Sequence, residues 1–315
     1  MHRAAENSKP RWGAAMLDDS LKTKLRDPAY LDHHLAAVRS THAVGRAEWY
    51  DAKFLRRFEV ARHFLATVNP AALDTFTRAF ERLKPPPGFR IAVLDNLFDG
   101  ATRQRILEIS RTIRDEKPEA DRQTKCEAER FGRRVIWDHP YFLDLQCDLL
   151  PRVSDLAGCE LRAGYNFLSL YGGDGRCAPH MDEPISMYTL DYCIEQSWEW
   201  PIHFSKVVEW PTVETFRSFD AEAMKRDPAL AFAPHVLQPN QALLFNGSSQ
   251  WHYRDSIAPG GFCDLLFFHY YPAGCEKLVY PRLWHEHFDI PELRALCDLF
   301  DEEDLREQEI PGAQG

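Results

Sequence analysis

The chain has 315 residues, and 44% of them are hydrophobic, which is enough for a sizeable core in one large domain or two smaller ones. The formal net charge of −10 argues against nucleic-acid binding. No apolar run is long enough to span a bilayer, and the polar N-terminus lacks the apolar core of a signal peptide. The eight cysteines form no Cys-x-x-Cys pair, so we expect free thiols and a cytoplasmic protein without membrane partners.

The first ninety residues show helical periodicity. Apolar residues recur at helical spacing between about 46 and 65, and a second such stripe runs from Leu73 to Leu83. Asn69 and Pro70 are typical of an N-cap followed by a first-turn proline. The prolines at 85–87 end this region. Residues 1–90 contain no chemical motif, and we interpret them as a helical segment that serves as a scaffold or as a homodimer surface.

Residues 91–160 alternate between short strands and helices. A strand is predicted at 91–94, followed by a helix that Asp99 caps and that buries three isoleucines, Ile106, Ile109 and Ile113. The charged residues 115–132 are predicted to form a loop. A strand is predicted at 133–137, and a helix at 140–156.

From residue 161 the pattern changes to short β-prone runs separated by turns. These runs lie at 163–171, 187–194, 201–209, 234–238, 242–246, 250–254 and 262–271. Their spacing predicts two facing antiparallel sheets, as in a sandwich or barrel, with Phe167, Leu190, Ile202, Leu244 and Phe267 buried. A helical insertion is predicted at 212–230 and a last helix after Pro291. We therefore expect three parts: residues 1–90, a β core at 91–275, and a C-terminal helix and tail at 276–315.

The stretch from Tyr165 to Asp182 suggests chemistry. A strand with aromatic side chains leads into a glycine-rich turn and ends on Pro-His-Met-Asp. On an extended segment His180 and Asp182 point to the same side, so both can meet one cation. His252 lies on a later predicted strand. His, Asp and His are the ligands of the facial triad that holds non-haem Fe(II), and we expect these three residues to be the metal-binding and catalytic set.

These residues carry a resemblance. Residues 179–184, the strand at 188–190, Trp200-Pro201-Ile202, residues 251–254 and residues 267–270 resemble the motifs of Fe(II)/2-oxoglutarate-dependent oxygenases. The resemblance covers roughly residues 90–272. It implies an α+β fold with a double-stranded β-helix core, a jelly roll of the cupin kind flanked by helices. It also implies Fe(II), 2-oxoglutarate and O2, and the oxidation, most often hydroxylation, of a C–H bond in a small-molecule or amino-acid-like substrate. Halogenases of this superfamily lack a carboxylate at the position of Asp182, so the resemblance argues against halogenation.

The sequence departs from the resemblance at the co-substrate anchor. Many members carry an Arg on the strand after the distal His, but residues 262–266 contain no Arg or Lys. Arg254 has the right parity relative to His252 and a planar fork that suits a carboxylate, so we expect it to be the anchor, assisted by Tyr165 or Tyr171. Lys206 is the second choice for this role. The alternative for Arg254 is an ion pair with Asp255 or Asp264.

Other residues are left outside the site. His269 lies in an apolar strand and is expected to be a packed histidine with a backbone partner. Arg133 and Arg134 line either a substrate mouth or a solvated strand edge.

Two other functions stay open. The same ligands would serve a cupin-type metal enzyme that does not use 2-oxoglutarate, or a zinc hydrolase. A jelly-roll binding module without catalysis is the third interpretation, and the intact His-Asp-His set argues against it.

Overall fold

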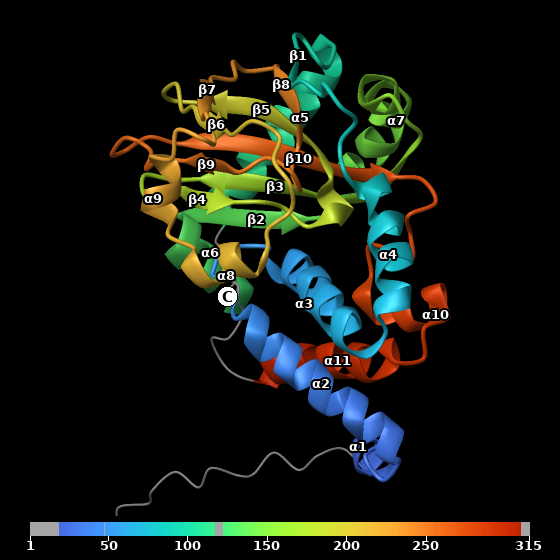
Figure 1. Cartoon of the computed structure of the whole chain (residues 1–315). Helices are drawn as coiled ribbons and strands as arrows, with labels where there is room; N and C mark the ends of the chain where they lie inside the picture. The colour runs from blue at the N-terminus through green and yellow to red at the C-terminus, as the bar shows by residue number, and fades with distance from the viewer. Residues whose placement is uncertain (1–18, 47, 117–121, 310–315) are drawn as a thin grey trace, which may run out of the picture.

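The computed structural model describes residues 19–46, 48–116 and 122–309, and its centre is a pair of antiparallel sheets (Figure 1). The larger sheet has the strand order β1-β8-β5-β10-β3-β2, and the smaller has the order β4-β9-β6-β7. The strands are β1 (Ala92–Leu94), β2 (Arg133–Trp137), β3 (Leu161–Tyr171), β4 (Cys177–His180), β5 (Tyr188–Gln196), β6 (Ile202–Phe204), β7 (Ala233–His235), β8 (Ala242–Asn246), β9 (His252–Arg254) and β10 (Cys263–Pro272).

The path of the chain through these sheets is that of a jelly roll. From β3 onward the chain crosses repeatedly between the sheets, with β3, β5, β8 and β10 in the larger one and β4, β6, β7 and β9 in the smaller. The five residues predicted to be buried are all at most 9% exposed. Phe167, Ile202 and Phe267 face the interior between the sheets, and Leu190 and Leu244 lie on the other face of the larger sheet, in the core shared with the helices. The predicted double-stranded β-helix is therefore confirmed.

Two helices lie against the larger sheet, α5 (Gly100–Asp115) and α7 (Pro140–Ala157). Asp99 caps α5, as predicted, by accepting a hydrogen bond from Thr102 N at 2.8 Å. Gln146 of α7 donates to the backbone oxygens of Tyr165 and His269 at 3.1 and 2.9 Å. These contacts fix α7 on strands β3 and β10, and Ser110 of α5 donates to Asp264 of β10 at 2.9 Å.

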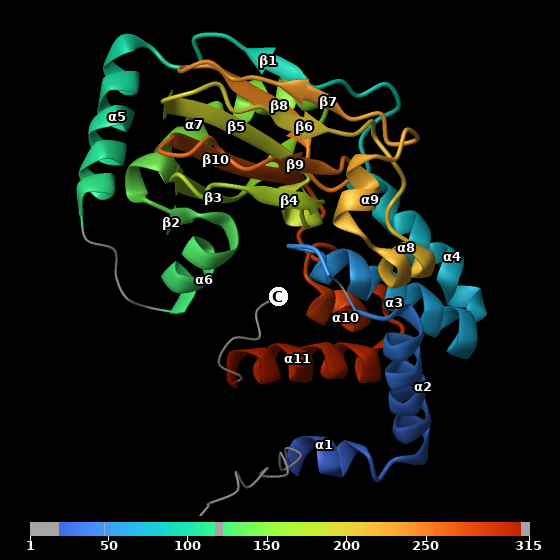
Figure 2. The same ribbon diagram turned by 90° about the vertical axis from the view of Figure 1, so that its left-hand side faces the viewer.

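The N-terminal and C-terminal helices pack on one another beside the sheets, as Figures 1 and 2 show. They are α1 (Asp19–Lys24), α2 (Pro28–Val44), α3 (Lys53–Val68), α4 (Pro70–Ala79), α10 (Trp284–Phe288) and α11 (Leu293–Glu309). Asn69 caps α4 as predicted. Arg57 of α3 donates to Asp304 Oδ1 at 2.6 Å and to Phe300 O at 2.8 Å, both on α11. The helices of predicted segments 1–90 and 276–315 thus form one helical unit.

Three sequence predictions were wrong in detail. The charged residues 122–131 form helix α6 (Arg122–Phe131) where a loop was expected. This helix is held by buried Phe131 and by the ion pair of Glu127 with Arg133, and neither follows from an apolar stripe. The helix expected from residue 46 begins at Lys53, and the strand expected at 201–209 ends at Phe204. The insertion at 212–230 contains α8 (Val213–Ser218) and α9 (Ala221–Lys225), as predicted.

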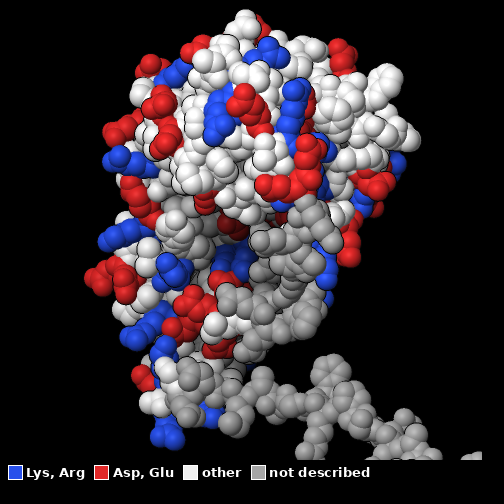
Figure 3. Space-filling view, turned by 180° about the vertical axis from the view of Figure 1, so that it is seen from behind, with Lys and Arg blue, Asp and Glu red and all other residues white. Residues whose placement is uncertain are grey.

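The surface carries charged side chains of both signs (Figure 3), as the charged content of the sequence predicts. On the face in Figure 3, acidic and basic side chains are interspersed. Within the described residues, no helix has both the length and the apolar character needed to cross a bilayer.

The aromatic cluster at the centre of the helical unit should dominate its stability. Phe76 is fully buried, and its ring centroid lies 4.9 Å from those of Phe80 and Phe288 and 5.4 Å from that of Trp284. Phe76→Ala should lower the free energy of unfolding by about 3–5 kcal/mol, because it removes a buried ring and leaves a cavity. Leu156→Ala, at a side chain that is 43% exposed, is the control and should cost far less in urea denaturation. Equal losses of unfolding free energy in Phe76→Ala and Leu156→Ala would contradict the proposal that the aromatic cluster dominates the stability of the helical unit.

Candidate metal centre

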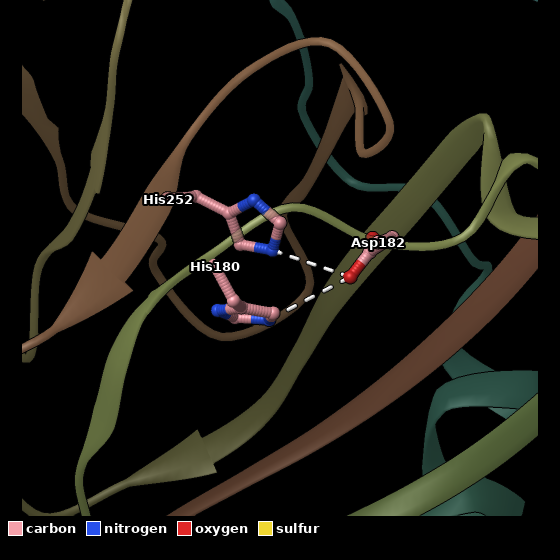
Figure 4. A group of neighbouring side chains, drawn as sticks. All are labelled: His180, Asp182 and His252. Atoms are coloured by element: carbon pink, nitrogen blue, oxygen red, sulfur yellow. Dashed lines mark ion pairs between the residues drawn. The ribbon is translucent and has the colours of Figure 1, made fainter. Parts of the chain in front are cut away.

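The three predicted ligands come together between the sheets (Figure 4). His180 ends β4 and pairs in antiparallel register with His252, the first residue of β9. Asp182 follows two residues after His180. One ligand atom from each of the three residues lies within 4.8 Å of the others, and all three side chains are buried. Among the described residues this is the one such group of His, Cys, Asp and Glu.

Both imidazoles are held in the orientation that a metal requires. The Nδ1 atom of His180 lies 3.0 Å from Ala178 O, and Nδ1 of His252 lies 3.0 Å from Gln250 O. A carbonyl only accepts, so each Nδ1 carries the hydrogen and each Nε2 keeps its lone pair. These Nε2 atoms lie 3.6 and 3.5 Å from Asp182 Oδ1, so three donor atoms converge.

The carboxylate of Asp182 is fixed from the other side. The backbone N of Asp182 donates to Gly247 O at 2.9 Å, and Oδ2 of the carboxylate accepts from Thr189 Oγ1 at 3.1 Å. Burial alone would raise the pKa of Asp182, but positive charge at His252 and His180, when these are protonated, outweighs burial and holds the pKa below its usual range; a cation bound at the same place acts in the same direction. Burial lowers the pKa of His180. The site therefore combines an ionised carboxylate with imidazole nitrogens that can bind a metal, a donor set that fits Fe(II) and also Zn(II).

A cavity adjoins the three ligands. Residues of both sheets and of the segment before α3 line it. Its wall is formed mainly by aromatic and apolar side chains, with a few charged and hydroxyl groups. The lining residues are Tyr50, Asp51, Arg133, Tyr165, Phe167, Tyr171, Cys177, His180, Asp182, Thr189, Ile202, Phe245, His252, Tyr253, Arg254, Phe267 and His269.

Three of the four predicted anchor residues line this cavity. Tyr165 accepts a hydrogen bond from Ser186 Oγ at 2.8 Å, and Tyr171 contacts Arg133. Arg254 is buried and donates to Asp191 Oδ2 at 2.7 Å and to Trp200 O at 2.6 Å. Lys206 is exposed and lies outside the cavity wall, because β6 ends two residues before it.

The ion pairs around Arg254 differ from the expected alternative. Asp255 pairs with Lys225, and Asp264 pairs with Arg114. The partner of Arg254 is Asp191, which faces it from β5 of the opposite sheet. The two partners lie on different sheets and are far apart in the sequence, so the local sequence around Arg254 could not predict this pair.

His269 faces the cavity, which the sequence interpretation missed. Its Nδ1 lies 3.0 Å from the side-chain Oγ1 of Thr189, so its partner is a hydroxyl and not the expected backbone group. Its Nε2 is buried and has no hydrogen-bond partner among the described residues. Burial lowers the pKa of His269 to about 4. The alternation of β10 offered a signal, because Phe267 and His269 have the same parity.

Three further cavity residues come from outside the core strands of the jelly roll. Tyr50 and Asp51 belong to the segment before α3, and the Tyr50 ring centroid lies 5.9 Å from that of His180. Arg133 begins β2, and its side chain is 4% exposed, so the predicted solvated edge does not apply to it. No motif marks Tyr50 or Asp51, since they reach the site only through the packing of the helical unit.

Comparison with known proteins gives structural neighbours only. No protein-family model and no curated protein matches the chain. Among solved structures, HygX from Streptomyces hygroscopicus with nickel and 2-oxoglutarate bound is 15% identical, with a TM-score of 0.44, covering 63% of this chain and 86% of HygX. The non-heme alpha ketoglutarate dependent epimerase SnoN from nogalamycin biosynthesis is 13% identical, with a TM-score of 0.46, covering 65% and 85%. EctD from S. alaskensis, with 2-oxoglutarate and 5-hydroxyectoine, is 14% identical, with a TM-score of 0.46, covering 73% and 80%.

Gly247 is the residue that leaves room for the carboxylate of Asp182. A Cβ atom at this position would overlap Asp182 Oδ2 and lie 2.8 Å from Ser186 O. Gly247→Ala should therefore displace Asp182 and weaken Mn(II) binding by about ten- to a hundred-fold, as for the loss of a group that orients a ligand. Calorimetric titration of Mn(II) measures this. Gly100→Ala, where nothing lies within 4 Å, is the control. Unchanged Mn(II) affinity in Gly247→Ala would contradict the assignment of Asp182.

Proposed function

We propose that this protein is a non-haem Fe(II)- and 2-oxoglutarate-dependent dioxygenase that oxidises a C–H bond of a small-molecule substrate. The observation that carries the proposal is the buried His180, Asp182 and His252 set opening on a cavity that also contains two arginines. Two imidazoles and one carboxylate form the donor set of non-haem iron oxygenases and leave coordination positions for a co-substrate and oxygen. The neighbours whose names mention 2-oxoglutarate or alpha ketoglutarate are consistent with it.

The roles of the chain's own residues follow from their contacts. His180, Asp182 and His252 would hold the metal. Bound Fe(II) with 2-oxoglutarate would supply the oxidant for the C–H bond, with loss of CO2 and formation of succinate. Thr189 and Gly247 position Asp182, and the carbonyls of Ala178 and Gln250 orient the imidazoles. Phe167, Phe245 and Phe267 line the cavity and exclude water from the reacting centre.

The far carboxylate of the co-substrate would lie at the arginine-lined side of the same cavity. A buried carboxylate without donors is costly, so the cavity has to supply a cation or several hydrogen bonds. Arg254, Arg133 and Tyr171 all line the cavity and offer such groups, and Tyr165 adds a hydroxyl. Lys206 lies outside it.

The substrate class is a small molecule. The cavity wall combines aromatic and apolar side chains with a few charged and hydroxyl groups, which is typical of a site for a compact metabolite or an amino-acid-like compound. Asp51 and Tyr50, on the wall contributed by the helical unit, are the residues that we expect to contact it, and hydroxylation is the proposed outcome.

Release of succinate from 2-oxoglutarate in the presence of Fe(II) and ascorbate tests this function. Asp182→Ala should lower succinate formation more than about a hundred-fold, because removing a ligand costs more than removing a group that only orients one. Asp74→Ala, at an exposed aspartate paired with Arg78, should behave as the unmodified chain. A cupin-type enzyme without 2-oxoglutarate, or a zinc hydrolase, would release no succinate with either variant or with the unmodified protein.

We also propose that two copies associate through the N-terminal helices. Leu31, Leu35 and Val38 of α2 are 37%, 44% and 44% exposed and lie at helical spacing along one stripe. Burying such a stripe against its copy is favourable. The molar mass of the unmodified chain in light scattering should be that of a dimer, and Leu35→Glu should give a monomer. A monomeric unmodified chain would overturn this proposal without affecting the enzymatic one.

A further inference from the structure

Arg133 occupies an unusual position for a charged residue. It begins β2 and stands opposite Tyr171 in the register of β2 with β3. Its side chain is 4% exposed, and it lines the cavity beside the metal ligands. Its guanidinium carbon lies 4.3 Å from the centroid of Phe131 and 5.5 Å from that of Phe167, so aromatic rings enclose it. The fold therefore keeps the Arg133 guanidinium out of water, and each of its N–H donors needs an acceptor inside the protein.

Two of the three nitrogens of Arg133 have acceptors and one does not. Nε donates to Glu127 Oε2 at 2.6 Å, and Nη1 donates to the hydroxyl of Tyr171 at 2.9 Å. Nη2 is buried and has no hydrogen-bond partner among the residues that the structure describes. Leaving a buried donor unsatisfied is unfavourable, so a native arrangement of this kind points to an acceptor supplied by a ligand.

Arg254, the anchor expected from the sequence, is in a different situation. Its Nη1 donates to Trp200 O and its Nη2 to Asp191 Oδ2, and the Asp191 side chain has no exposure. Each terminal nitrogen of Arg254 thus already has an acceptor, and a ligand carboxylate that drew Arg254 toward itself would break the pair with Asp191. Breaking such a pair is strongly unfavourable, because it leaves Asp191 as an uncompensated buried charge.

Tyr171 connects the two arginines. Its hydroxyl accepts from Arg133, so its own hydrogen is available to a further acceptor. Its ring packs against Trp200 with centroids 4.8 Å apart, and the guanidinium of Arg254 lies 4.9 Å from the Trp200 ring. A carboxylate beside Tyr171 would therefore meet Nη2 of Arg133 and the tyrosine hydroxyl directly, with Arg254 close behind.

We infer that Arg133, on the strand preceding the jelly roll, is the residue that directly binds the far carboxylate of the 2-oxo dicarboxylic acid, with Tyr171 as second donor and Arg254 as a positioning residue. This inference rests on the proposed function. The ligand class is a 2-oxo acid that carries a second carboxylate at its other end. Residues 262–266 lack the arginine or lysine that the resemblance predicts for the co-substrate anchor. Arg133 would replace it from β2, which lies on the other side of β3 from β10.

Equilibrium binding of two 2-oxo acids tests the inference without turnover. The full chain is loaded with Mn(II) without oxygen, and calorimetry gives the Kd of 2-oxoglutarate and of 2-oxopentanoate, which ends in a methyl group where 2-oxoglutarate has its far carboxylate. The unmodified chain should bind 2-oxoglutarate much more tightly. In Arg133→Met this preference should fall on the order of thirty-fold or more, the usual effect of removing one partner of a buried charged contact. The Kd of 2-oxopentanoate and the Mn(II) affinity should change little.

Two further variants keep the test independent of folding. Arg133→Met leaves Glu127 buried without its partner, so the double variant Arg133→Met with Glu127→Gln removes both charges, and Glu127→Gln alone is its control. Arg133→Lys retains the charge and should restore part of the preference, because an ammonium lacks the planar fork.

The outcomes separate this inference from the function on which it rests. Retained preference in all the Arg133 variants, with loss of preference in Arg254→Met, would assign the anchor to Arg254 and overturn the inference while leaving the proposed function intact. An unmodified, Mn(II)-loaded chain that does not prefer 2-oxoglutarate would overturn the proposed function itself.

Discussion

The position of the Asp182 carboxylate is the constraint on which the rest of the site depends. A buried carboxylate needs partners, and here they come from three separate parts of the chain: Thr189 on β5 and the two imidazoles on β4 and β9. Gly247, after β8, accepts a hydrogen bond from the backbone N of Asp182. The next residue, Glu183, accepts a hydrogen bond from Phe54 N at 3.1 Å at the start of α3. The loop that carries Asp182 is therefore hydrogen-bonded both to the jelly roll and to the helical unit, so the position of the Asp182 carboxylate depends on both.

The same requirement explains the arginines. Each buried guanidinium of the cavity has a carboxylate of its own, Glu127 for Arg133 and Asp191 for Arg254. With these pairs in place the chain can fold with both cations buried before any anionic ligand arrives. Under the proposed function, a ligand carboxylate would meet the unpaired Nη2 of Arg133 and the positive charge of the two arginines.

The sequence was informative wherever the determinant is local. Caps at Asn69 and Asp99, the alternation of the core strands and the spacing of His180 and Asp182 are local patterns, and the structure has each of them. Prediction was weaker where a partner lies elsewhere. Helix α6 depends on an ion pair of Glu127 with a residue of β2, and Arg254 pairs across the sheets with Asp191. Lys206 has the parity of the inward residues Ile202 and Phe204, but parity means nothing beyond the end of β6.

The segment before α3 shows how a non-core element can shape the site. Trp49 packs against Trp251, next to the ligand His252, with centroids 5.0 Å apart, and Phe54 holds Glu183. Asp51, between these two fixed points, has a φ of 61°, a left-handed conformation that aspartate adopts more readily than most residues. Burial raises the pKa of Asp51 well above its usual value, which favours its neutral form and a hydrogen-bonding role over that of a counter-ion. Under the proposed function the jelly roll would supply the metal ligands, and β2 and β3 the groups that bind the co-substrate. The choice of substrate would then depend on a wall that the helical unit builds.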